Sequence, residues 1–167
     1  MTLVGVVSDT HGQFDPWLEE LFDGVAHILH GGDIGPESIV EELERLAPVT
    51  AVCGNTDHGL SEVRFPVWSR ARVEGVGFLL THIVGDPLRP GEELRRHLTE
   101  SKARVVVFGH THVPRAVESD SVLWLNPGSA GPRRFRLPRS ACLLDLDGLR
   151  PSFYDLERRE PFDPGTP

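Results

Sequence analysis

Short apolar runs, each stopped by glycine and polar residues, recur along this chain. They are rich in valine, isoleucine and leucine, which is typical of strands buried on both faces of a parallel sheet. The clearest runs cover residues 3–7, 25–30, 49–53 and 104–108. Segments 14–22 and 37–47 lie between the first three runs and carry apolar residues at helical spacing, with acidic residues opposite. This alternation predicts parallel βαβ units with right-handed crossovers.

The pattern changes in the second half of the chain. Segments 70–74 and 76–80 flank a glycine as the strands of a hairpin do, and a helix is expected to end at Glu100. Two later segments, 115–125 and 141–155, read as hairpins that turn at Ser119-Asp120 and Asp147-Gly148. We therefore expect an α/β fold with two sheets packed face to face, one mostly parallel and one more antiparallel, with helices outside.

The length of 167 residues predicts one domain. We place this domain at residues 1–157 and expect 158–167, which contains three prolines, to be a loosely ordered C-terminal tail. Cys53 and Cys142 are too few for a disulfide framework, so we interpret both as core thiols of a protein from a reducing compartment.

Charge and hydropathy narrow the range of partners. The net charge is −8, from 17 basic and 25 acidic side chains, which opposes non-specific binding to nucleic acid. The chain opens without a signal-peptide pattern and has no apolar stretch of membrane-spanning length, so we expect a cytoplasmic protein that does not bind membranes. The sequence leaves open whether the chain forms a homo-oligomer.

Seven polar residues follow the predicted strands at the points where the strands end. They are Asp9, His11, Asp33, Asn55, His82, His110 and His112. Successive groups lie 22 to 28 residues apart, about the length of a strand and its crossover. Because ligands bind beyond the carboxyl ends of parallel strands, all seven are expected to meet at one rim.

The donor types in this set indicate a metal centre. Four imidazoles, two carboxylates and one amide suit Mn, Fe, Ni, Co or Zn and are too rich in nitrogen for Mg or Ca. Seven ligands exceed what one ion accepts. Two ions that share a bridging carboxylate and a bridging hydroxide account for the number, and such pairs cleave phosphoesters by in-line displacement.

Six motifs carry a resemblance to a known family. In order they are Ser8-Asp9-Thr10-His11-Gly12, Gly31-Gly32-Asp33, Gly54-Asn55-x-Asp57, Thr81-His82, Gly109-His110-Thr111-His112 and Asn126-Pro127-Gly128-Ser129. This set resembles that of the calcineurin-like metallophosphoesterases, specifically the small YfcE-type phosphodiesterases. The resemblance implies a four-layer α/β/β/α sandwich of two mixed sheets and a dinuclear site, often assayed with manganese.

The resemblance also implies a division of the ligands between two ions. Asp9, His11, Asp33 and His112 would hold the first ion. Asp33, Asn55, His82 and His110 would hold the second. Asp33 would therefore bridge, with Asn55 and His110 beside it as further catalytic residues.

These observations favour a metal-dependent phosphodiesterase that attacks aryl or cyclic-nucleotide diesters with a metal-bridging hydroxide. The expected partner is a small phosphodiester or nucleotide. Two alternatives stay open: a phosphomonoesterase or nucleoside-polyphosphate hydrolase, and a non-catalytic binding scaffold like the retromer subunit that resembles this fold. The complete ligand set counts against the scaffold, which needs no cluster of histidines.

The chain departs from the family pattern beside the motif asparagine. Many relatives carry histidine there as the acid that protonates the leaving oxygen, whereas this chain has Thr56. Leaving groups that depart as stable anions should therefore be favoured. His58 is a candidate for a shifted general acid, and the alternative is an exposed loop histidine.

A group of arginines, Arg133, Arg134, Arg136 and Arg139, follows the last motif. Guanidinium groups match phosphate oxygens, so Arg133 and Arg134 are candidate substrate-binding residues, together with Asn55. The alternative is a solvated loop that balances an acidic surface.

Overall fold

The computed structural model describes residues 1–165 and contains two β-sheets and three helices. The elements are β1 (Leu3–Val7), α1 (Trp17–Leu21), β2 (His27–His30), α2 (Ser38–Glu44), β3 (Val49–Ala51), β4 (Trp68–Val73), β5 (Val76–Thr81), α3 (Glu92–Ser101), β6 (Val105–Val107), β7 (Arg115–Ser119), β8 (Val122–Asn126), β9 (Ser140–Asp145), β10 (Arg150–Asp155) and β11 (Glu160–Phe162). None of the helices in the described residues is long and apolar enough to cross a membrane.

The first sheet has six strands in the order β11-β10-β9-β1-β2-β3. β1, β2 and β3 run parallel to one another, because α1 and α2 form the crossovers between them. β9 pairs antiparallel with the other edge of β1, and β10 and β11 continue that half of the sheet as antiparallel strands. The three βαβ strands predicted from the apolar runs are thereby confirmed.

The second sheet has five strands in the order β4-β5-β6-β8-β7. β5, β6 and β8 are parallel, while β4 and β7 pair antiparallel at the two edges. The turn between β7 and β8 passes through Asp120 and Ser121, one residue later than the predicted Ser119-Asp120. Both residues have positive φ, as the two central residues of a type I′ hairpin turn do.

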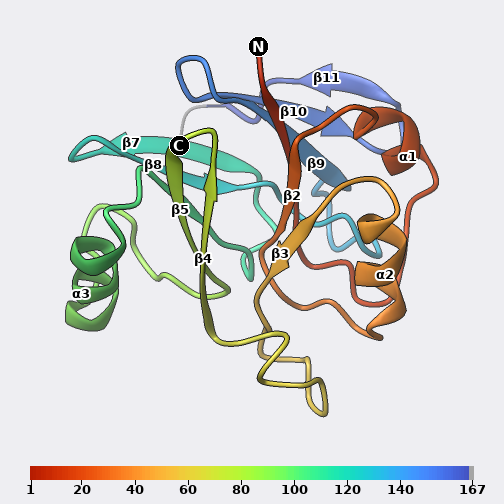
Figure 1. Ribbon diagram of the computed structural model, residues 1–167. Coiled ribbons are helices and arrows are strands. Elements are labelled where there is room, and N and C mark those ends of the chain that lie inside the picture. Colours follow the sequence, from red (N-terminus) through yellow and green to blue (C-terminus); the bar gives the residue numbers. More distant parts are fainter. Residues whose placement is uncertain (166–167) are drawn as a thin grey trace.

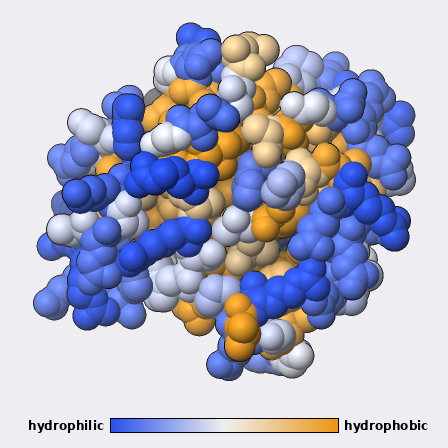
Figure 2. Space-filling model, in the orientation of Figure 1, coloured by the Kyte–Doolittle hydropathy of each residue, from blue (hydrophilic) through white to orange (hydrophobic). Residues whose placement is uncertain are grey.

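The two sheets pack face to face and form the middle of a four-layer α/β/β/α sandwich. Apolar side chains from both sheets meet in one buried cluster, which includes Val6 and Leu29 from the first sheet and Leu80 and Val107 from the second. α1 and α2 cover the outer face of the first sheet and α3 covers the second (Figure 1). Hydrophilic residues line both flanks of the face shown in Figure 2, with hydrophobic residues between them.

The predicted fold class is confirmed, and the structure differs at the C-terminus. Glu160–Phe162, which lies in the segment expected to be a loose tail, forms strand β11 at the edge of the first sheet. The prolines misled the prediction because an edge strand tolerates proline, whose missing N–H is not needed there. Pro161 indeed lies within this strand, opposite Tyr154. The last two residues of the expected tail, 166 and 167, lie outside the described residues.

Candidate metal centre

The seven predicted residues lie on loops that follow five strands: β1, β2 and β3, which are parallel neighbours in the first sheet, and β5 and β6, which are parallel neighbours in the second. Asp9 and His11 follow β1, and Asp33 follows β2. The remaining members, Asn55, His82, His110 and His112, follow β3, β5 and β6. Each sheet therefore contributes the carboxyl ends of its parallel strands to one rim, the usual ligand position in α/β folds.

Five of these residues have a left-handed backbone conformation. The φ angles of Asp9, His11, Asp33, His110 and His112 lie between 45° and 68°. Residues other than glycine rarely adopt this conformation, which costs of order 1–3 kcal/mol each and clusters at functional sites. The rest of the fold must therefore stabilise a strained backbone at these five residues, which follow the ends of the strands.

The Asp9 carboxylate is held by one of its two oxygens. Oδ2 accepts hydrogen bonds from the Ser8 hydroxyl at 2.6 Å and from the backbone N–H of His110 at 3.1 Å. Oδ1 is buried and accepts no hydrogen bond within the described part of the chain. Its neighbours are imidazole nitrogens instead: His112 Nε2 lies 3.0 Å away. A buried, unpaired carboxylate oxygen of this kind calls for a cation.

Asp33 is anchored in the same manner. Its Oδ1 accepts a hydrogen bond from the backbone N–H of Thr56 at 2.8 Å, and its Oδ2 lies 3.3 Å from His82 Nε2 and 3.7 Å from His11 Nε2. Burial opposes ionisation, but the neighbouring His82 imidazole and the hydrogen bond from Thr56 hold the pKa of Asp33 well below its usual range. Asp33 is therefore a carboxylate whose free oxygen lies between two histidines.

His82 is oriented by the backbone of the neighbouring sheet. Its Nδ1 lies 2.7 Å from the carbonyl oxygen of Gly31, which can only accept, so Nδ1 carries the proton and donates. Nε2 is left facing Asp33 and Asn55 Oδ1, the latter at 3.1 Å. Burial lowers the pKa of His82, but the Asp33 and Asp9 carboxylates outweigh it and raise the pKa overall. A fixed outer hydrogen bond of this type is typical of histidines that bind metals.

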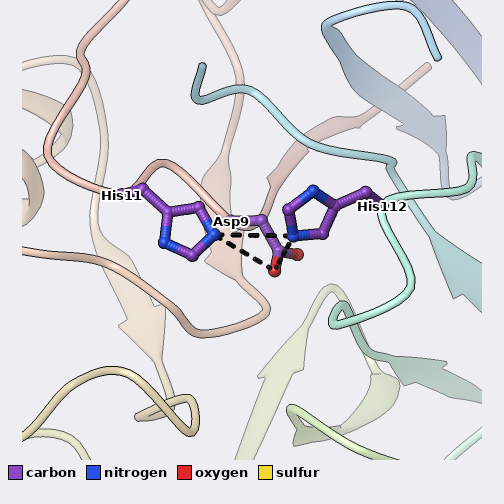
Figure 3. A group of neighbouring side chains, drawn as sticks. All are labelled: Asp9, His11 and His112. Atoms are coloured by element: carbon purple, nitrogen blue, oxygen red, sulfur yellow. Dashed lines mark hydrogen bonds and ion pairs between the residues drawn. The ribbon is translucent and has the colours of Figure 1, made fainter. Parts of the chain in front are cut away.

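His11 and His112 face each other across Asp9 (Figure 3). Their Nε2 atoms lie 3.5 Å apart, and both point towards the Asp9 carboxylate. Burial lowers the pKa of His11 despite the nearby Asp33 and Asp9 carboxylates. A neutral imidazole at this position presents a lone pair to its neighbours, as a metal ligand must.

Asn55 and His110 complete the cluster on its exposed side. Asn55 Oδ1 lies 2.9 Å from His110 Nδ1 as well as 3.1 Å from His82 Nε2. The amide oxygen thus lies between two histidines, as Asp33 Oδ2 does. The rings of His82 and His110 are edge to face, with centroids 5.3 Å apart.

The structure brings all seven predicted residues together, and they fit divalent metal ions. Two overlapping groups have donor atoms within 4.8 Å of one another: Asp9, His11 and His112 form one, and Asp9, Asp33 and His82 form the other. The donors are imidazole nitrogens and carboxylate oxygens, which suit Mn, Fe, Co, Ni or Zn. A cation bound here would neutralise the two buried carboxylates and would give the unpaired Asp9 oxygen a partner.

Asp57 is a supporting residue whose role the sequence did not reveal. Its carboxylate accepts hydrogen bonds from the backbone N–H groups of Ile34 and Gly35 at 3.0 Å and of Gly54 at 2.7 Å. It therefore ties the loop after β2 to the loop after β3. The close approach of these loops also requires Gly54, since a Cβ there would collide with Asp33.

His30 is a second supporting residue, fully buried beneath the rim. Its Nδ1 accepts a hydrogen bond from the backbone N–H of Gly32 at 3.1 Å, and its Nε2 lies 3.0 Å from the Thr10 hydroxyl. Burial lowers the pKa of His30 to about 4. A neutral His30 thus joins the loop that carries Asp9 to the loop that carries Asp33.

The arginines that follow the last motif have different partners, and only some of them lie near the cluster. Arg139 forms an ion pair with Asp15 at 2.8 Å and donates to two backbone carbonyls, so it supports the fold. Arg133 pairs with Glu157 at 3.3 Å on the surface. Arg134 lines a small cavity together with His110 and His112, and its charge is one of the influences that lower the pKa of His11. Of the two candidate substrate-binding arginines, Arg134 is the one beside the cluster.

His58 lies in an exposed turn just after Asp57. Within residues 1–165, no hydrogen bond or ion pair joins His58 to the seven residues of the cluster. Its proposed role as a general acid therefore stays a prediction.

Asp86 lies in the loop that follows His82. It accepts a hydrogen bond from the backbone N–H of Leu88 at 3.0 Å and is a turn residue.

Comparison with known proteins identifies relatives of this chain. Residues 2–149 match the model of the calcineurin-like phosphoesterase superfamily domain. A probable metallophosphoesterase of Methanothermobacter thermautotrophicus is 35% identical over 153 residues, which cover 87% of each chain. The phosphodiesterase YfcE of Escherichia coli is 31% identical over 122 residues, or 68% of this chain and 62% of that protein.

Solved structures share the architecture. The YfcE structure superposes with a TM-score of 0.67 at 22% identity and covers 97% of both chains. Vacuolar protein sorting 29 from Cryptosporidium parvum gives a TM-score of 0.76 at 24% identity, over 96% of this chain and 94% of that one. These likenesses establish the fold. The family match over residues 2–149, together with the buried Asp and His groups at the rim, shows that this chain belongs to the calcineurin-like phosphoesterase superfamily.

Proposed function

We propose that this protein is a phosphodiesterase that depends on two divalent ions, with manganese the favoured metal and the cytoplasm its site of action. Asp9, His11, Asp33 and His112 would hold one ion. Asp33, Asn55, His82 and His110 would hold the other. The observation that carries the proposal is the arrangement of the two buried carboxylates: each has one oxygen bonded to protein donors and the other directed at imidazole nitrogens.

The proposed roles of the residues follow from this arrangement. When bound, such a pair of ions would supply a hydroxide nucleophile at neutral pH and would neutralise charge on the phosphate oxygens. Asp33 would be a ligand to both ions, because its Oδ2 lies near a histidine of each proposed set, His82 and His11. The backbone N–H of Thr56 and the carbonyl of Gly31 hold Asp33 and His82 in place before substrate arrives.

Arg134 is proposed as the phosphate-binding residue outside the metal centre. It lies beside His110 and His112 at the edge of the cluster. A guanidinium group binds two phosphate oxygens at once and stays charged at every physiological pH. Arg133, which is engaged with Glu157, contributes less to substrate binding under this proposal.

The residues around Asn55 favour substrates with good leaving groups. Thr56 has no side chain able to donate a proton at neutral pH, so an acid worth about 10²–10⁴-fold in rate is missing from that position. Aryl diesters and strained cyclic nucleotides need little protonation of the departing oxygen. We therefore infer that these diesters are better substrates than alkyl monoesters.

The test begins with protein stripped of metal. Manganese, nickel, zinc or magnesium is added back singly, and hydrolysis of bis-p-nitrophenyl phosphate and 2′,3′-cyclic nucleotides is measured beside the Asp33→Asn variant. Restored activity that the variant lacks supports the proposal. If no metal raises activity above the variant, the protein is not such an enzyme and a binding scaffold becomes the better explanation. Faster cleavage of monoesters or nucleoside polyphosphates would instead favour a phosphatase or polyphosphate hydrolase.

A further inference from the structure

An apolar pocket adjoins the metal centre on the side of Asn55 and His82. Its volume is about 400 Å³, within the range of small-molecule sites. It is lined by Cys53, Gly54, Asn55, Val67, Trp68, Thr81, His82, Ile83 and Glu93. We call this the ring pocket. Two members of the proposed ligand set thus form part of its wall, so the pocket opens directly onto the place of the phosphate.

The apolar part of the wall is presented to solvent. Val67 is 59% exposed and Ile83 is 51% exposed, although both are branched aliphatic side chains. They come from different segments, the approach to β4 and the loop after β5, and meet at this pocket. Exposed apolar side chains gathered at a hollow mark a site that gains stability when a ligand covers them.

Trp68 gives the pocket a rigid side. Its ring stacks on His97 of α3, with centroids 4.2 Å apart and an angle of 18° between the planes. Because the ring is held from outside, little side-chain freedom is lost when a ligand contacts it. A flat aromatic surface of this kind pairs favourably with another ring.

Glu93 brings negative charge to an otherwise apolar wall. It is exposed, at the N-terminus of α3. A carboxylate at this position repels an anionic group and accepts hydrogen bonds from amino groups. The charge therefore disfavours a second phosphate in the pocket and favours an uncharged ring.

We propose that the ring pocket binds the planar, uncharged aromatic ring of one ester group of the substrate while the phosphate lies on the metal centre. The ring is an aryl group attached directly to the phosphate or a nucleobase attached through its sugar. This inference rests on the proposed function and adds to it a basis for selecting among diesters, namely the aromatic ring of one ester group. A larger cavity of about 620 Å³ between β7, β10 and β11 shares no lining residue with the centre and offers no such link.

The proposal is tested by binding, without turnover. Calorimetry on the manganese-loaded protein compares phenylphosphonate with methylphosphonate, and adenosine 5′-monophosphate with ribose 5-phosphate. We expect at least one ring-bearing ligand to bind about tenfold or more tightly than its partner. A preference within the first pair places the ring next to phosphorus, and one within the second pair places it beyond a ribose. Equal affinities within both pairs would overturn the proposal.

Variants locate the effect in the pocket. Val67→Ser combined with Ile83→Ser should reduce the preference for the ring to about threefold or less. The matched control is Val63→Ser, which alters a valine that is 95% exposed in the same segment but outside the pocket. This control should keep the full preference. A preference that survives in the double variant would contradict the proposal.

Two further comparisons distinguish a failed pocket from a damaged metal centre and from a failed function. If the double variant no longer binds methylphosphonate, the Ile83→Ser change next to His82 has disturbed the centre. The single variant Val67→Ser then decides: a reduced preference for the ring-bearing ligand supports the proposal, and an unchanged preference contradicts it. Failure of the proposed function looks different from failure of the pocket. Wild-type protein that prefers the ring but cleaves no diester refutes the function alone, whereas cleavage without any preference refutes the pocket alone.

Discussion

The backbone N–H of Thr56 donates a hydrogen bond to Asp33 Oδ1 at 2.8 Å. The residue next to Asn55 is therefore fixed against the proposed bridging carboxylate by its main chain, and its side chain is exposed. This backbone hydrogen bond does not depend on the identity of the side chain. Position 56 is therefore where we expect catalytic chemistry to be alterable without removing a residue of the proposed ligand set.

Replacing Thr56 with histidine should add a general acid to the site. For Thr56→His, we expect alkyl diesters to be cleaved faster, by up to about 10²–10⁴-fold, because a proton can then reach a poor leaving group. Cleavage of bis-p-nitrophenyl phosphate, whose leaving group needs no proton, should change little. Steady-state rates on both substrates provide the measurement, with Thr56→Gln as the control of similar polarity. An equal rate change on both substrates would argue against this role.

His58 offers a separate test of the general acid. If it protonates the leaving group, His58→Ala should remove the basic limb of the pH–rate profile, because activity then no longer depends on a protonated imidazole. Rates on a cyclic nucleotide between pH 6 and pH 10 give the profile. An unchanged profile in the variant would leave His58 as an exposed loop residue.

Two neighbouring arginines should differ in their effect on substrate binding. Arg134→Ala should raise KM by about tenfold or more, since it removes the guanidinium beside His110 and His112. Arg133→Ala removes the same charge from a surface pair with Glu157 and should change KM by less than about threefold. The comparison uses bis-p-nitrophenyl phosphate at fixed manganese. Similar values for the two variants would indicate a general effect of charge.

Asp57→Asn should weaken the joint between the loops after β2 and β3. The two oxygens of the Asp57 carboxylate accept hydrogen bonds from three backbone N–H groups. Asparagine has only one acceptor oxygen, and its NH₂ group would face at least one of these N–H donors. We expect the free energy of unfolding to fall by about 2 kcal/mol in urea. Asp86→Asn, in an exposed turn, is the control and should change stability by less than about 0.5 kcal/mol. Equal stability of the two variants would refute the role of Asp57.

Burial of His30 should make the stability of the metal-free protein depend on pH. The pKa is about 4 in the folded state against 6.5 ordinarily, so between these values the unfolded chain binds more protons. The stabilisation that neutral His30 gives to the folded state is therefore complete above pH 6.5 and is lost as the pH falls to about 4. This loss lowers the free energy of unfolding by about 3 kcal/mol. Urea unfolding at several pH values should show a flatter dependence for His30→Gln. Parallel curves for variant and wild type would contradict the prediction.

The order of the strands and the position of the site were predictable because both depend on local pattern. Apolar runs that end in a glycine and a polar residue mark β1, β2, β3 and β6, and the rule that ligands collect at the carboxyl ends of parallel strands places the polar residues together. The left-handed backbone at Asp9 and Asp33 was not predictable, since nothing in the two aspartates themselves requires it.

The supporting contacts were missed for a different reason. Asp57 and His30 act by bonding to loops that are distant in sequence, and only the packed structure shows which N–H groups face them. The ring pocket likewise forms from Val67 and Ile83, which belong to separate loops. The end of the fold was misjudged because β11 is an edge strand, where proline carries little penalty.

The distribution of the ligands between the sheets has a mechanical consequence. Asp9, His11, Asp33 and Asn55 are attached to the six-stranded sheet, and His82, His110 and His112 to the five-stranded one. Any cation shared between these groups cross-links the two halves of the sandwich at one end. Resistance to heat and to proteolysis should therefore follow metal supply in the cell, and a chelator should act on this protein as a denaturant as well as an inhibitor.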